Sequence, residues 1–198
     1  MQRRIFIVAA ALMMTFFSKA QMQPTELDKS PMDMSYSPNA FPIMKVQGKA
    51  SGTPNARVVY SRPQKKGRII FGGEVKYDEV WRLGANENTE IEFFKDATFA
   101  GKKIAKGRYT MFCIPTADNW TIIINKDTDN WGNFNYNSKK DLFRVTLPVQ
   151  KNDVVENFTM YFDNSNNLLI FWDDVKMAVP VTFAGDKPTA PAKPKGGN

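Results

Sequence analysis

The chain has 198 residues, with 27 Lys and Arg against 20 Asp and Glu, a formal net charge of +7, one cysteine and no histidine. The lack of histidine excludes Ser-His-Asp and Cys-His catalytic triads and the usual zinc and non-haem iron sites, and a single cysteine excludes an internal disulfide. We therefore assign no cofactor and no metal, and any catalysis would depend on carboxylates, Lys, Tyr or Ser.

The first 20 residues have the layout of a cleaved secretory signal peptide. Arg3 and Arg4 precede an apolar run over residues 5–17, and Ser18 and Ala20 are the small residues of a cleavage site. The run is shorter than the roughly 17–25 residues that span a bilayer, which argues against a transmembrane segment. We predict export to the periplasm or outside the cell, after cleavage near Ala20.

The basic charge lies mainly at the two ends of the chain. Removing Arg3, Arg4 and Lys19 with the signal peptide lowers the formal charge from +7 to about +4. Further lysines lie in a Pro- and Gly-rich segment over residues 185–198, which we predict to be a disordered tail. The remaining domain is close to neutral, so we expect no nucleic-acid partner.

The mature chain divides into an arm and one domain. Residues 21–42 are rich in Pro, Ser and Met without a period, which predicts a linker or a loosely docked arm. Over residues 43–184, short β-branched and aromatic runs alternate with turn residues. We expect strands, or short strand–turn units, at residues 56–61, 90–94, 97–101, 108–115, 120–125, 143–147, 158–162, 168–172 and 177–183.

These elements predict an all-β fold. About eight to nine mostly antiparallel strands without a convincing amphipathic helix indicate a single β-sandwich or flattened barrel. Pro180 cannot donate to a strand ladder, which makes the last strand an edge or a bulge site.

One long segment interrupts this pattern. Residues 60–89 contain three arginines, an Asn-Glu pair, Trp81 and four glycines, without a helix or strand period. We predict a long ordered loop, and such loops are uncommon unless they are functional.

Four polar residues of this loop are candidates for ligand binding: Arg62, Arg82, Asn86 and Glu87. Arginine recognises carboxylates and phosphates through two parallel hydrogen bonds. The same side chains could instead pair with Glu87, Asp141 or backbone carbonyls and lock the loop, and both interpretations remain open.

A second group of candidates is aromatic. Trp131 and Tyr136 lie in the polar segment WGNFNYN and could stack against a sugar ring, whereas Trp120 and Trp172 fit the core by alternation. The run of residues 127–132 resembles a calcium loop, but Trp131 stands where a ligand is needed and Ser138 where the bidentate Glu belongs. A turn rich in Asn and Asp is the better interpretation.

The segment RPQKKGRIIFGGEVKYDEVWRLGANENT, followed by GKKIAKGRYTMFCIP, NWTIIINK, WGNFNY and DLFRV, resembles a family of secreted bacterial domains of unknown function. The resemblance extends over residues 30–183, and the blocks RPxxKGRxIFG and VWRxGANExT are distinctive. It implies an exported β-rich domain without an established activity, and it transfers no catalytic role to any residue.

The sequence leads to three functional hypotheses. The first is a ligand-binding domain that holds a small polar or sugar-like molecule at the Arg/Asn/Glu loop. The second is a hydrolase that uses Glu87 with an acidic partner such as Asp141, because two carboxylates suffice for glycoside cleavage. The third is a structural or interaction domain of the cell envelope.

Overall fold

The computed structural model describes residues 25–185, so the predicted signal peptide and all but the first residue of the predicted tail lie outside the described residues. The described range contains eleven strands, one short α-helix and one 3-10 turn. Their bounds are β1 Met32–Ser37, α2 Phe41–Val46, β2 Ala56–Ser61, β3 Thr89–Phe93, β4 Ala97–Phe99, β5 Lys102–Ile104, β6 Gly107–Pro115, β7 Asn119–Asn125, η2 Ser138–Lys140, β8 Asp141–Pro148, β9 Gln150–Phe162, β10 Leu168–Val179 and β11 Val181–Phe183.

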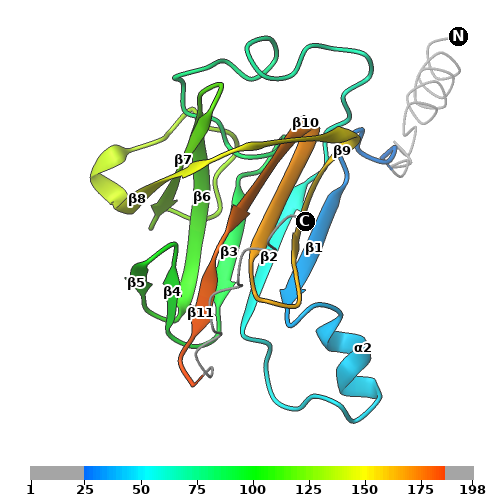
Figure 1. Cartoon of the computed structure of the whole chain (residues 1–198), viewed down its shortest axis with the longest axis vertical. Coiled ribbons are helices and arrows are strands. Elements are labelled where there is room, and N and C mark those ends of the chain that lie inside the picture. The colour runs from blue at the N-terminus through cyan, green and yellow to red at the C-terminus, as the bar shows by residue number, and fades with distance from the viewer. Residues whose placement is uncertain (1–24, 186–198) are drawn as a thin grey trace, which may run out of the picture.

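The larger layer is a six-stranded antiparallel sheet with the order β1-β2-β3-β6-β7-β8 (Figure 1). The central parts of β6 and β7 are buried on both faces, whereas other strands alternate between buried apolar and more exposed polar side chains. In β3, for example, Ile91 and Phe93 are buried while Glu90 and Glu92 are half-buried on the other face. This period of two fixes which face of the sheet covers the core.

The second layer is formed by the β9–β10 hairpin and by a three-stranded sheet with the order β11-β4-β5. In Figure 1, β10 crosses in front of the six-stranded sheet, and β11 continues downward to β4 and β5. Pro180 separates β10 from β11, and its carbonyl accepts a hydrogen bond from the Ala100 N–H at 2.8 Å. The prediction of an all-β fold is confirmed. Because the sheets are not closed, the fold is not a barrel.

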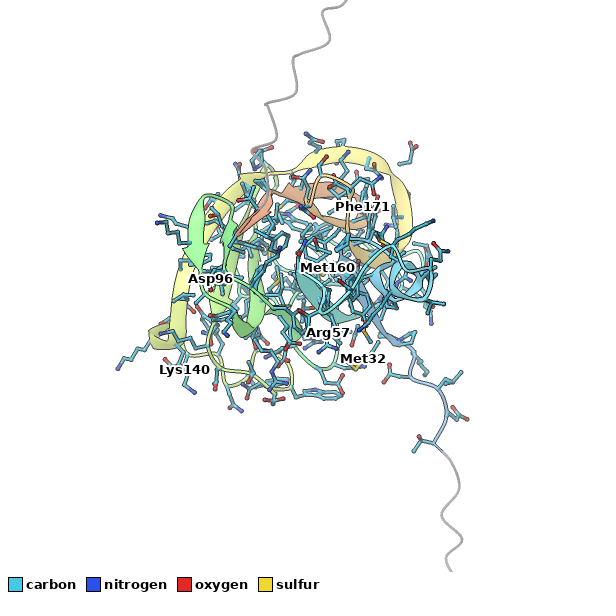
Figure 2. All side chains as sticks on the ribbon, turned by 90° about the horizontal axis from the view of Figure 1, so that it is seen from below. Met32, Arg57, Asp96, Lys140, Met160 and Phe171 are labelled. Atoms are coloured by element: carbon cyan, nitrogen blue, oxygen red, sulfur yellow. The ribbon has the colours of Figure 1, made fainter. Side chains whose placement is uncertain are left out.

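Aromatic side chains fill the space between the layers. Trp120 and Trp172 are both buried, and Trp81 packs edge-on against Trp120 with ring centroids 6.1 Å apart. Figure 2 shows Met160 of β9 in the interior, whereas Lys140 extends outward at the periphery of the molecule. Burial of such large side chains is the dominant favourable term in the stability of a domain of this size.

The long loop is ordered and belongs to the core. Residues 62–88 contain no regular strand or helix, but Ile70 and Leu83 are fully buried. Isolated bridges attach the loop to its surroundings, including Gln64 to Asn157 of β9 and Trp81 to Cys113 of β6. The loop is therefore a fixed wall of the domain.

The N-terminal arm differs from the sequence expectation, because residues 21–42 include strand β1 and the first residues of α2. β1 pairs with β2 along the edge of the large sheet. Its inward side chains are Ser35 and Ser37, while Met32 and Met34 point outward and are exposed. The hydrophobic pattern therefore gave no indication of a strand. No helix within residues 25–185 has the length and apolarity needed to cross a bilayer.

Candidate functional site

A cleft of about 330 Å³ lies against the long loop. Trp81 and Trp172 of the aromatic core line the cleft together with charged side chains of the loop. The charged lining residues are Arg68, Glu74, Lys76, Glu79 and Arg82. They sum to one net positive charge.

Arg82 is the unusual member of this set. Its Nε atom is buried without a hydrogen-bond partner, and its guanidinium makes no hydrogen bond or ion pair within residues 25–185. Burial lowers the pKa of Arg82 below its usual value, because removing water disfavours the charged form. Buried polar groups are normally paired. A half-buried arginine without a partner in the protein is therefore a candidate for contact with a ligand.

The backbone on both sides holds Arg82 in place. The neighbouring Trp81 exchanges two backbone hydrogen bonds with Cys113, at 2.7 and 2.8 Å. Leu83 has a positive φ of 56°, which turns the chain sharply after the arginine. Gly132 faces the guanidinium, and a Cβ atom there would lie 3.2 Å from Arg82 Nη1. The position of Arg82 is thus set by its surroundings rather than by an ion pair.

The other arginine of the cleft is fully paired. Arg68 donates to Glu74 at 2.8 Å and to the carbonyl oxygens of Gln64 and Lys65. Both members of this ion pair are exposed at the rim. The surplus charge of the cleft therefore comes from Arg82 and Lys76, which face one acidic residue, Glu79.

Arg62 has a structural role and does not line the cleft. Its guanidinium donates to Asp33 of β1 at 3.0 Å, to Thr159 of β9 at 2.9 Å and to the carbonyl of Phe158 at 3.2 Å. Its backbone N–H also donates to the carbonyl of Pro31 at 3.0 Å. Arg62 thus joins the edge of the large sheet to the second layer.

Asn86 and Glu87 lie where the loop meets residues 130–132. Asn86 has a positive φ of 56°, and its carbonyl accepts a hydrogen bond from the Gly132 N–H at 2.9 Å. This pairing places Glu87 opposite Trp131. Those two side chains border a second pocket of about 370 Å³, separate from the lining of the Arg82 cleft.

Tyr136 lies apart from both pockets, in a hydrogen-bond network with Asp141 and Arg144. Its hydroxyl donates to Asp141 at 2.8 Å and accepts from Arg144 at 2.6 Å. Burial, together with the neighbouring Asp141 carboxylate, raises the pKa of Tyr136 to about 12. Asp141 also accepts hydrogen bonds from Asn125 and Arg144. No hydrogen bond, ion pair or shared pocket joins Asp141 to Glu87 in the described part of the chain, so the acid–base pair considered for a hydrolase gains no support.

The six sequence candidates are therefore divided among different surroundings. Arg82 lines the cleft, Glu87 and Trp131 line the second pocket, and Asn86 supplies the backbone contact between their segments. Arg62 and Tyr136 lie in internal networks. Asn88 was not among the sequence candidates, although it is buried with both side-chain amide atoms unpaired within the described residues. An asparagine in a turn-rich segment carries no sequence signal of burial.

Residues 25–185 contain no group of three or more His, Cys, Asp or Glu side chains arranged to hold a metal ion. In the turn of residues 127–132, Asp127 pairs with Lys140 and Asp129 pairs with Arg108. The two carboxylates are thus occupied by cationic side chains of the domain itself.

Comparison with known proteins gives one family. No curated protein and no solved structure matches the chain. Residues 42–181 match a family described as "Protein of unknown function (DUF2911)", and this span begins after β1 and ends within β11. Because the match covers well over half of the sequence, the chain belongs to the DUF2911 family of proteins of unknown function.

Proposed function

We propose that this domain binds a small acidic molecule, carrying a carboxylate or a phosphate, in the cleft at Arg82. The observation that supports the proposal is the half-buried guanidinium without a partner. A bound anion would accept charge-assisted hydrogen bonds from the Arg82 guanidinium, which no group of the described protein accepts. The planar guanidinium also matches the two oxygens of a carboxylate.

The rest of the cleft fits a small organic acid. Trp81 and Trp172 provide apolar surface, and the paired Arg68 and Glu74 leave little net charge at their side of the rim. Small-molecule sites typically combine apolar walls with a few polar groups that fix orientation. Here Arg82 is the half-buried member of the charged lining, and Trp81 and Trp172 supply the apolar surface.

Isothermal titration of the mature domain with small mono- and dicarboxylates and phosphate monoesters tests the proposal, with the corresponding neutral amides as controls. We expect Arg82→Gln to weaken anion binding by about tenfold or more, as for a charged hydrogen bond worth about 1.5–3 kcal/mol. Arg82→Lys keeps the charge but loses the planar geometry, so it should rescue little. The matched control is Lys102→Gln, which removes one exposed positive charge from β5, outside the cleft.

Two results would contradict the proposal. One is a wild-type protein that binds none of the acids. The other is an Arg82→Gln variant that binds them as well as the Lys102→Gln control does.

We also propose that the protein is exported and that its signal peptide is cleaved after Ala20. The support is the basic start, the short apolar run and the small residues before Gln21. Mass spectrometry of the protein made in a bacterial host should give a mature chain that starts at Gln21. An intact N-terminus on cytoplasmic protein would refute export.

A further inference from the structure

A second pocket lies beside Trp131, in the turn that follows β7. The pocket has a volume of about 370 Å³, which is within the range of small-molecule sites. The Trp131 side chain is 56% exposed, and Met32 and Val59 add apolar surface. An exposed indole on a polar turn offers a flat stacking surface that the core does not use.

Asn88 gives this pocket an unpaired polar group. The residue is only 5% exposed, and neither its side-chain oxygen nor its nitrogen has a hydrogen-bond partner within the described residues. Leaving a buried amide unpaired is costly, and such groups in native proteins call for an explanation. Asn88 borders the Trp131 pocket and also a small inner void of about 10 Å³.

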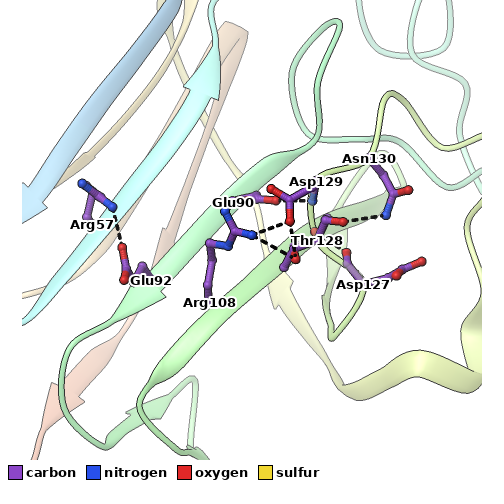
Figure 3. Close-up of polar contacts among 9 residues, drawn as sticks. Arg57, Glu90, Glu92, Arg108, Asp127, Thr128, Asp129 and Asn130 are labelled. Atoms are coloured by element: carbon purple, nitrogen blue, oxygen red, sulfur yellow. Dashed lines mark hydrogen bonds and ion pairs between the residues drawn. The ribbon is translucent and has the colours of Figure 1, made fainter.

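The charged groups of the pocket are all acidic: Glu87, Glu90 and Asp129. Arg108 occupies two of them, through an ion pair with Asp129 and a 3.5 Å contact with Glu90. Figure 3 shows these three side chains close together. Glu87 is exposed and makes no side-chain hydrogen bond within residues 25–185. The carboxylates repel an anion, so the ligand class differs from that of the Arg82 cleft.

We propose that the Trp131 pocket binds the neutral ring of a sugar. The apolar face of the ring would stack on the Trp131 indole, as sugar rings do on exposed aromatic surfaces. Ring hydroxyls can both donate and accept, so they can donate to the Glu87 carboxylate and meet both the acceptor and the donor of the Asn88 amide. Arg108 contributes one positive charge against three carboxylates, so the pocket stays net negative and rich in acceptors. A neutral ligand whose hydroxyl groups donate hydrogen bonds suits such a pocket.

The experiment follows the Trp131 indole N–H signal by two-dimensional NMR of the mature protein. The titrants are methyl glucoside, methyl galactoside, N-acetylglucosamine, cellobiose and maltose, at concentrations up to about 50 mM, because a shallow site of this kind binds at roughly millimolar affinity. We expect at least one sugar to shift the Trp131 signal in a saturable way. Tetramethylammonium and acetate are the cationic and anionic comparisons.

Three variants test the assignment. Trp131→Ala should abolish binding, whereas Phe134→Ala removes an aromatic that is 78% exposed on the same turn, outside the pocket, and should leave binding unchanged. Asn88→Leu replaces the unpaired amide by an apolar group of similar size, so it should weaken sugar binding tenfold or more without lowering the melting temperature. Arg82→Gln should bind sugar normally, which separates this site from the acid-binding cleft.

Several outcomes would overturn the proposal. They are an absence of any sugar-induced shift at Trp131, a shift caused by tetramethylammonium but by none of the sugars, and equal loss of binding in the Trp131 and Phe134 variants. If the Asn88 amide served only the inner void, Asn88→Leu would lower the melting temperature and leave sugar binding intact.

Discussion

Arg62 and Arg82 belong to the same loop, but the structure predicts opposite effects of removing their charges. The change to make at both positions is Arg→Met, which keeps an apolar stem of similar length. At Arg62 the change removes three guanidinium hydrogen bonds, one of them to the Asp33 carboxylate. At Arg82 it removes none among the described residues, and it relieves a buried Nε without a partner.

The magnitude follows from those contacts. A hydrogen bond to a charged group contributes about 1.5–3 kcal/mol, but the Arg62 and Asp33 side chains are 34% and 40% exposed, so water replaces part of the loss. We estimate that Arg62→Met lowers the free energy of unfolding by about 2–4 kcal/mol. In a domain of this size that corresponds to roughly 5–15 °C in melting temperature. We expect Arg82→Met to change the free energy of unfolding by no more than about 0.5 kcal/mol, or to raise it slightly.

Urea unfolding followed by tryptophan fluorescence measures both variants, and equal slopes against urea concentration make the free energies comparable. Arg62→Lys should recover little, because one ammonium group cannot replace a planar fork that reaches three acceptors. A loss in Arg82→Met as large as that in Arg62→Met would show that Arg82 has a structural partner, and it would refute our reasoning about the cleft.

Three further predictions concern groups away from the cleft. Burial raises the pKa of Tyr60 to about 12, so between pH 10 and pH 12 the folded protein keeps a proton that the unfolded chain releases. The free energy of unfolding should therefore fall as pH rises through this window. An equally steep fall in the Tyr60→Phe variant would contradict the assignment. Burial also raises the pKa of the Cys113 thiol, so a thiol reagent should label it only at the rate of unfolding, and rapid labelling of the native protein would show that the site opens. A Cβ atom at Gly73 would overlap the carbonyl oxygen of Ile69, so Gly73→Ala should lower the melting temperature by more than Gly48→Ala, which meets no atom within 4 Å and bears only the strain of a positive φ of 70°.

Local patterns were sufficient to predict most strands. The alternation of Glu90, Ile91, Glu92 and Phe93 predicts β3 directly, because each apolar side chain falls on one face. β1 escaped prediction because its inward positions are serines, whose hydroxyls bond to distant partners: Ser37 donates to Asn166 at 2.7 Å. Such a strand is stabilised by its neighbours and not by its own hydrophobicity.

The sequence identified Arg62 and Arg82 as candidates but could not assign their partners. Arg62 bonds to Asp33 and Thr159, which are 29 and 97 residues away along the chain. No local pattern encodes contacts at such separations, and the lack of a partner for Arg82 is visible only when all neighbours are placed. The export signal and the ligand class remain predictions that the proposed experiments test.

The way the long loop is anchored has a consequence for the kinetics of ligand exchange. The cleft wall at Trp81 is hydrogen-bonded to β6, and the adjoining Leu83 is fully buried, so moving this wall aside would expose the core. A ligand must therefore enter through the open mouth of a site that already has its final shape. We expect association in a single step, with an observed rate that rises linearly with ligand concentration and shows no plateau from a slow opening of the loop.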